Sequence, residues 1–75
     1  MATAMERAVT RERLEQAEQQ VSDGERQIAR LREMIAQARR LAHDIQPALN
    51  LLHQAEHALA SHLANRDRLR RELGV

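Results

Sequence analysis

One long run of alternating three- and four-residue spacing between apolar and small residues constrains this chain more than any other feature. It starts at Leu14, ends at Ile45 and passes every position without a change of phase. Such spacing is typical of a helix that packs against another helix along its whole length. The seam positions are Leu14, Ala17, Val21, Gly24, Ile28, Leu31, Ile35, Ala38, Ala42 and Ile45.

The composition favours helix and limits how such a chain can be stabilised. Its 75 residues include two glycines and one proline, and none is Cys, Phe, Tyr or Trp. Without cysteine the chain forms no disulfide and no thiolate metal site, and without aromatic residues it has no stacking surface for single-stranded nucleic acid. Because a chain of this size buries only a small core, we expect self-association to supply part of its stability.

The charges are nearly balanced. Twelve basic residues, all arginine, stand against 11 acidic residues, for a formal net charge of +1. A balance of this kind does not steer a protein toward a polyanion. The sequence contains no apolar run that approaches membrane-spanning length. We therefore expect a cytoplasmic protein that has no cofactor and no membrane association.

Two regions leave the helix boundaries open at this stage. Residues 1–13 form a polar extension with little to bury, so they are either helical or frayed. The run Ser22-Asp23-Gly24-Glu25 matches a capping box, in which a new helix begins with Ser22 as the N-cap. The seam, however, crosses Gly24 in phase, which favours one continuous helix with a close approach to its neighbour at the glycine.

The boundary between two helices is predicted near Asp44. Asp44 is a favourable N-cap, and Pro47 falls in the first turn of a second helix, where its missing N–H removes no intrahelical hydrogen bond. A first helix that continued through Pro47 would be disrupted at a cost of about 3 kcal/mol. The predicted hairpin covers residues 14–74, with a first helix to about 42, a turn at about 42–44 and a second helix over about 45–73 that ends at Gly74.

A connection this short makes the two helices antiparallel, which gives an all-α, coiled-coil-like hairpin. With Ala42 opposite Ile45, the register places Leu63 opposite Gly24 and Leu73 opposite Leu14. The predicted hairpin core is Leu14, Val21, Gly24, Ile28, Leu31, Ile35, Ala38, Leu49, Leu52, Ala55, Leu59, Leu63 and Leu73.

The second helix has a wider apolar face than one partner helix can cover, because its leucines and alanines spread over about half of its circumference. Met34 and Leu41 also lie together on one flank of the first helix, outside the seam. A homodimer that forms a four-helix bundle, with a two-fold axis near Met34, Leu41, Leu51 and Ala58, would cover both sets. The alternatives are a monomer with exposed leucines and a groove filled by an unidentified protein partner.

The histidines come nearest to a chemical signal. His53 and His57 stand one turn apart on the second helix, a spacing that can chelate a metal ion. An exposed pair binds a metal only weakly without further ligands, so no metal site is predicted and these two are kept as candidates. His62 is expected at the edge of the core. His43 belongs to the turn, where it can bond the last carbonyls of the first helix.

The C-terminal end of the second helix is basic. Arg66 and Arg70 interrupt its apolar face, and Glu18 and Glu25 flank the positions expected opposite them. We therefore predict ion pairs between the two helices. The alternative use of residues 66–71 is contact with phosphate or nucleic acid.

Two runs of sequence carry a resemblance. They are Val21-Ser-Asp-Gly-Glu-Arg-Gln-Ile-Ala-Arg-Leu-Arg-Glu33 and His62-Leu-Ala-Asn-Arg-Asp-Arg-Leu-Arg-Arg-Glu-Leu73. Together with His43-Asp44, they resemble a group of short, uncharacterised bacterial proteins. The resemblance implies a helical hairpin and brings no activity. That group tends to carry a glycine before the turn, where this chain has Ala42, so the first helix is expected to end without a glycine cap. The positions it singles out are Glu25, Arg26, Arg30, Arg66, Asp67 and Arg68.

The sequence contains no nucleophile–base arrangement, phosphate-binding loop or paired catalytic carboxylates, so we expect no enzyme. The predicted function is that of a small interaction, adaptor or structural protein acting through helix–helix association. A nucleic-acid-associated regulator that uses the basic helix end is the first alternative. Weak metal binding through His53 and His57 is the second.

Overall fold

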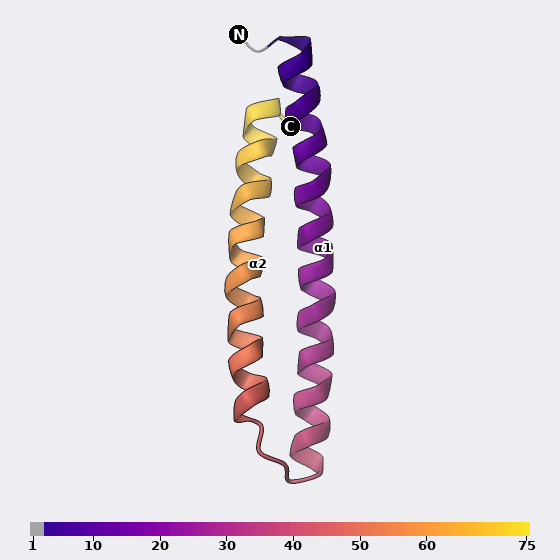
Figure 1. Cartoon of the computed structure of the whole chain (residues 1–75), viewed down its shortest axis with the longest axis vertical. Coiled ribbons are helices and arrows are strands. Elements are labelled where there is room, and N and C mark those ends of the chain that lie inside the picture. Colours follow the sequence, from indigo (N-terminus) through magenta and orange to yellow (C-terminus); the bar gives the residue numbers. More distant parts are fainter. Residues whose placement is uncertain (1–2) are drawn as a thin grey trace.

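The computed structural model describes residues 3–75, which form two long helices joined by a short turn (Figure 1). Helix α1 spans Ala4–Arg40 and helix α2 spans Gln46–Leu73. The helices run antiparallel, side by side, in a rod with principal extents of 58 × 15 × 14 Å. The all-α hairpin predicted from the seam is confirmed. Within residues 3–75, no helix combines the length and hydropathy that crossing a bilayer requires.

Helix α1 begins with a capping box. The Thr3 hydroxyl accepts a hydrogen bond from the Glu6 N–H at 3.1 Å, and the Glu6 carboxylate accepts one from the Thr3 N–H at 3.3 Å. Because the first amides of a helix have no partner within it, this exchange stabilises the helix start. The extension predicted as helical or frayed is helical from Ala4 onward, and residues 1–2 lie outside the described part of the chain.

Helix α1 continues through Ser22 and Gly24 without a break, so the alternative helix start at Ser22 is not used. Gly24 lies against α2, and a Cβ placed there would stand 3.3 Å from Leu59 Cδ1. The missing side chain lets the two helices approach closely, which compensates for a propensity cost of about 1 kcal/mol. The predicted register was wrong here, because Gly24 faces Leu59 and not Leu63.

Helix α1 ends at Arg40, two residues before the expected boundary, in a Schellman motif. The His43 N–H donates to the Ala38 carbonyl at 2.9 Å, and the Ala42 N–H donates to the Arg39 carbonyl at 3.1 Å. The motif requires one left-handed residue, and Ala42 supplies it with a φ of 56°. A Cβ is strained in this conformation, so α1 closes its last carbonyls at a local conformational cost.

Helix α2 is capped by the residue two positions before it. The Asp44 carboxylate accepts a hydrogen bond from the Gln46 N–H at 3.0 Å, although Ile45 occupies the N-cap position. The prediction of Asp44 as the N-cap was therefore wrong by one residue, while its capping bond is present. Pro47 lies in the first turn, where it interrupts no intrahelical bond. Gly74 ends the helix with a φ of 75°.

Two apolar clusters join the helices, one near the chain termini and one nearer the turn. Val21 and Ile35 are buried on the α1 seam as well, so the core follows that seam along nearly the whole length of α2. Full burial of each large aliphatic side chain contributes about 1.5–3 kcal/mol. The terminal cluster comprises Leu14, Ala17, Leu69 and Leu73, and the turn-side cluster comprises Ile28, Leu31 and Ala55 with the half-buried Leu52 and Leu59 packed against it.

Leu69 was missing from the predicted core, although its side chain is only 2% exposed. The seam of α2 keeps its three- and four-residue spacing from Leu59 through His62 and Arg66 to Leu69. His62 and Arg66 are half-buried in the structure. Because both are polar, they interrupt the hydrophobic pattern before Leu69, so the pattern does not predict that Leu69 is buried. The spacing itself was the signal that could have found it. The predicted core positions that are half-buried are Gly24, Ala38, Leu49, Leu52, Leu59 and Leu63.

Helix α1 extends past the end of α2, since it has 37 residues against 28 (Figure 1). One side chain links this overhang to the end of the shorter helix. Arg7 Nη2 donates a hydrogen bond to the Leu73 carbonyl at 3.2 Å. That carbonyl is among the last of α2, which have no partner within the helix, so the contact caps α2 with a residue of α1. Beyond it, Met5 is 78% exposed.

Candidate interaction surface

Exposed apolar side chains gather at the turn end of the hairpin. Met34, Leu41 and Leu51 are 56%, 58% and 52% exposed, and Ala58 is exposed as well. These four residues are called the turn-end apolar face below. Met34 lies on α1 and Leu41 is its C-cap, while Leu51 and Ala58 come from α2.

Helical geometry places these four residues on one side of the hairpin. Met34 and Leu41 are seven residues apart, and so are Leu51 and Ala58, which aligns each pair along one flank of its helix. Gln27 continues the first row, and it lines a shallow depression of about 190 Å³ together with Ala58. Both rows therefore border the same face.

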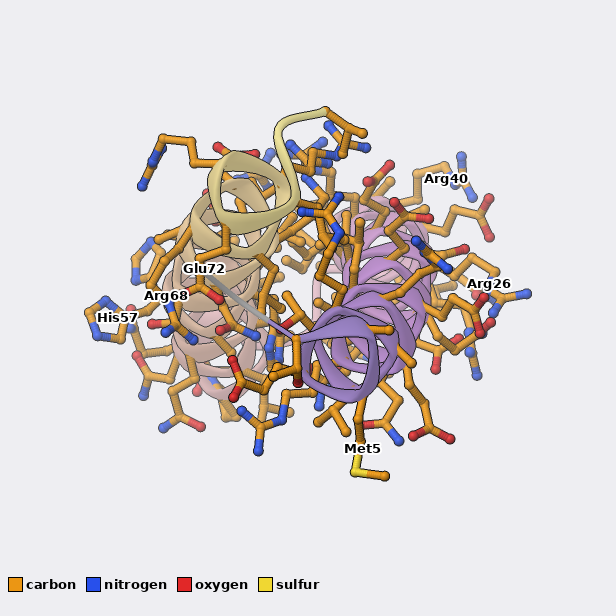
Figure 2. The ribbon with its side chains drawn as sticks, turned by 90° about the horizontal axis from the view of Figure 1, so that it is seen from above. Met5, Arg26, Arg40, His57, Arg68 and Glu72 are labelled. Carbon is orange, nitrogen blue, oxygen red and sulfur yellow. The ribbon has the colours of Figure 1, made fainter. Side chains whose placement is uncertain are left out.

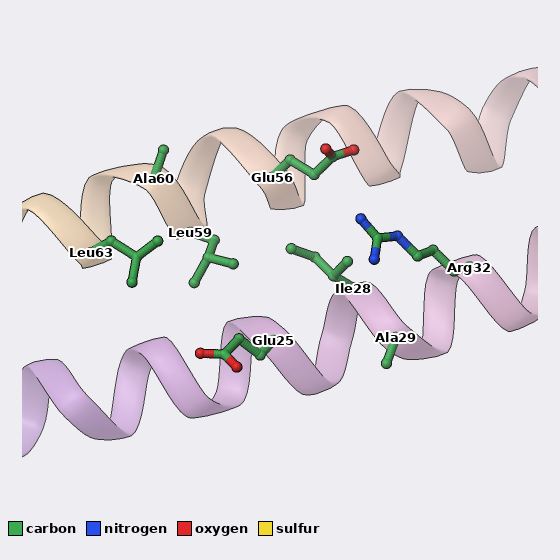
Figure 3. A pocket seen from close by; sticks show the side chains of 8 residues that line it. All are labelled: Glu25, Ile28, Ala29, Arg32, Glu56, Leu59, Ala60 and Leu63. Atoms are coloured by element: carbon green, nitrogen blue, oxygen red, sulfur yellow. The ribbon is translucent and has the colours of Figure 1, made fainter.

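The opposite face carries a larger groove between the helices, with a volume of about 430 Å³ (Figure 3). Its floor is apolar and includes Ile28, Leu59 and Leu63. Charged side chains stand at its edges, from Glu25 and Arg32 on α1 and from Glu56 on α2. Ala29 and Ala60 also line it, and their small side chains leave it open.

One of the predicted interhelical ion pairs is present. Arg70 lies 3.6 Å from Glu18, and both side chains are more than 40% exposed, so the pair contributes at most about 1 kcal/mol. Arg66 pairs instead with its neighbour Asp67 at 3.0 Å. The predicted pairing of Glu25 was wrong, because within residues 3–75 its carboxylate lies in no ion pair shorter than 4 Å and faces the groove instead.

The arginines at the basic end of α2 are largely paired with carboxylates of α2 and α1. Arg68 lies 3.4 Å from the Glu72 carboxylate and donates a hydrogen bond to the Asn65 side chain at 2.8 Å (Figure 2). With Arg66 on Asp67 and Arg70 on Glu18, three of the four terminal arginines have carboxylate neighbours. Such pairing does not favour phosphate binding at this end.

The candidate histidines lie apart from other ligands. His53 and His57 are exposed, and His57 points outward from the side of α2 that faces away from α1 (Figure 2). In the described part of the chain, no three His, Asp or Glu side chains come together in an arrangement that could hold a metal ion. His62 is half-buried and lines the shallow depression beside Gly24 and Ala58.

Asp23 accepts hydrogen bonds from two side chains of its own helix. A hydrogen bond from Arg26 lowers the pKa of the Asp23 carboxyl, and a second hydrogen bond from Gln19 at 2.9 Å lowers it further. All three residues lie on the exposed side of α1, within about two turns of the helix. Their hydrogen bonds stabilise the helix surface locally.

Comparison with protein-family models, with curated proteins and with solved structures gives no match to this chain. The resemblance of residues 21–73 to short bacterial proteins therefore stays a prediction. Of the positions it singles out, Arg66 and Asp67 pair with each other, while Glu25 faces the groove. Arg26 pairs with Asp23, and Arg30 is exposed.

Proposed function

We propose that this protein is a small, non-enzymatic interaction protein that acts through helix–helix association and forms a homodimer by its turn-end apolar face. The observation that carries the proposal is the exposure of Met34, Leu41 and Leu51 on a single face. Large apolar side chains gathered on one face of a folded chain are typical of an association surface. In the dimer, two hairpins give a four-helix bundle.

The total exposed surface supports association. The chain exposes 5822 Å². A compact monomer of 8.6 kDa exposes about 4,700 Å² on average, so the hairpin exposes roughly 1,100 Å² more than its mass requires. Specific protein interfaces bury about 800 Å² on each partner, which is of the same order as this excess.

A second copy fits this face because an isologous contact uses the same residues twice. Met34 and Leu51 lie on neighbouring helices, so a two-fold axis between them sets the apolar side chains of one copy against those of the other. The neighbouring positions Gln27 and Asn65 are polar and uncharged, so they add no like-charge repulsion to such a contact.

The experiment measures mass against concentration by sedimentation equilibrium for the wild type and for a Met34→Gln, Leu51→Gln variant. We expect the variant to have a lower average mass than the wild type at tens of micromolar, because both polar side chains would have to be buried in the contact. Met5→Gln is the matched control, since Met5 is exposed but lies outside the face. Identical curves for wild type and double variant would contradict the proposed contact.

A further inference from the structure

Helix α1 carries a regular charged row on the face opposite to the turn-end apolar face. Its members, Glu18, Glu25, Arg32 and Arg39, recur at seven-residue intervals and are all exposed. A seven-residue interval keeps side chains in one line along a helix. Glu25 and Arg32 border the 430 Å³ groove, which fixes the row to that face of the hairpin (Figure 3).

In a two-fold contact, the charges of this row are complementary to those of a second copy only when the two helices run antiparallel. Read along α1, the row is acidic, acidic, basic, basic. Beside a parallel copy, each charge would meet its like, which destabilises a contact. Beside an antiparallel copy, Glu25 of one chain is level with Arg32 of the other. Glu18, which also pairs with Arg70 of its own chain, is level with Arg39 of the other. The midpoint of this pairing falls between residues 28 and 29.

A row of small residues independently gives a midpoint within about half a residue of this one. Ser22, Ala29 and Ala36 are exposed and alternate with the charged row along the same side of α1. In an antiparallel pair, Ala29 meets its own copy, and Ser22 meets Ala36. Small side chains shorten the distance between packed helices, which brings the flanking charges of two chains within reach of each other.

From these two rows we infer that a second copy of this chain docks antiparallel along α1, with a two-fold axis at Ala29. The interface is isologous, so each charge pair occurs twice. Individually exposed ion pairs add little affinity. Their arrangement instead selects the antiparallel direction and the register, because every other register opposes like charges.

Helix α2 contributes apolar contact at the same level. Ala29 lines the groove together with Glu56, so the axis passes close to Glu56. Gly24 lies against Leu59, so Ala29 is level with residue 54 of α2. The axis therefore brings Leu49 of one copy level with Leu59 of the other, and both residues are half-buried.

Glu56 is the unfavourable position, since two copies of its carboxylate approach each other at the axis. The side chain of Arg32 extends from α1 toward the same end of the groove, where it can lie between the carboxylates (Figure 3). The groove contact uses no residue of the turn-end apolar face. One copy can therefore use both faces at once, and the groove contact does not depend on the proposed function.

The test uses the Met34→Gln, Leu51→Gln background, in which the groove face is the remaining contact. We expect this parent to reach the mass of a dimer, twice 8.6 kDa, in sedimentation equilibrium. Adding Glu25→Arg or Arg32→Glu sets two like charges opposite each other at both of the symmetry-related contacts. Either substitution should raise the dissociation constant of the dimer by about tenfold or more. Glu12→Arg is the matched control, because it makes the same charge change on α1 outside the paired segment of residues 18–39.

Mixing the two charge-reversed chains distinguishes a specific pairing of residues 25 and 32 from a non-specific effect of the altered net charge. An equimolar mixture of the Glu25→Arg and Arg32→Glu chains should form a heterodimer with the parent's affinity, and the Glu25→Arg, Arg32→Glu double reversal should form a homodimer. A parent that remains at 8.6 kDa, or a mixture that fails to associate, would overturn the inference. Neither result tests the turn-end apolar face, because that face is tested separately by comparing the wild type with the Met34→Gln, Leu51→Gln variant.

Discussion

The two ends of the hairpin differ in how deeply their leucine side chains are buried. At the terminal end, Leu69 and Leu73 are buried against Leu14 and Ala17 of α1. At the turn end, Leu51 is more than half exposed, although it belongs to the same helix as Leu69. Packing therefore buries the leucines of the terminal end, while it leaves Leu51 at the turn end largely in contact with solvent.

The helix ends at these two places share one hydrogen-bond pattern. At the end of α2, the Gly74 N–H donates to the Arg71 carbonyl at 3.2 Å and the Val75 N–H donates to the Arg70 carbonyl at 3.0 Å. The end of α1 has the corresponding two bonds, but its left-handed residue is Ala42. The turn end therefore has backbone strain at its cap, whereas the terminal end does not, because glycine adopts the left-handed conformation without a Cβ clash.

The largest test of this comparison truncates one leucine at each end. Leu69→Ala should lower the free energy of unfolding by about 3 kcal/mol, because it leaves a cavity between Leu14, Ala17 and Leu73. Leu51→Ala, measured in urea at a protein concentration where the chain is monomeric, should change it by less than about 0.5 kcal/mol. Equal effects would show that the turn end is packed as closely as the terminal end.

A smaller effect is expected from exchanging the left-handed residues. Ala42→Gly should raise the free energy of unfolding by about 1 kcal/mol, because glycine adopts a φ of 56° without a Cβ clash. Gly74→Ala should lower it by about 1 kcal/mol or less, since no atom lies within 4 Å of the added Cβ and only the backbone is strained. Thermal unfolding of both variants measures whether each substitution raises or lowers the stability. A destabilised Ala42→Gly variant would contradict strain at the turn.

The smallest effect concerns Asp23, which lies between the two ends on the exposed side of α1. Arg26→Gln should raise the pKa of the Asp23 carboxyl toward its ordinary value, because Arg26 is the main cause of its lowering. Since the folded pKa is lowered, this contribution to stability is present above the ordinary carboxyl pKa and is lost as pH falls through the folded value. Carboxyl-carbon NMR titration of both proteins measures the shift. An unchanged midpoint would assign the lowering to Gln19.

Most of the fold followed from spacing and a few boundary residues. The unbroken seam from Leu14 predicted a long first helix, and Asp44 with Pro47 predicted a second helix after a tight turn. The Thr3–Glu6 capping box is also visible in the sequence, as a Thr three residues before a Glu, and it predicts the start of α1 that the structure has. Local patterns of this kind depend on neighbours in the chain, so they can be recognised without a structure.

The exposed turn-end face was also derived from spacing, because residues beyond the seam cannot all be covered by one neighbour. The partners of polar residues were harder to predict. The sequence predicts that Arg66 pairs with an acidic residue on α1. In the structure it pairs with the carboxylate of Asp67, its neighbour in the chain, which is within reach without any contact between the helices. Long, exposed side chains choose among several partners of similar energy, so spacing alone does not decide between them.

The sequence by itself determined that residues 14–73 fold as two antiparallel helices, because hydrophobic phase and turn chemistry act locally. Only the tertiary structure decided the register, which sets Leu59 against Gly24, and the burial of Leu69 beyond two polar seam positions. It also decided that Ala42 takes a left-handed conformation to close α1. Each of these depends on the separation and relative shift of two packed helices, and those quantities are fixed by side-chain volumes in contact rather than by the order of residues in one helix.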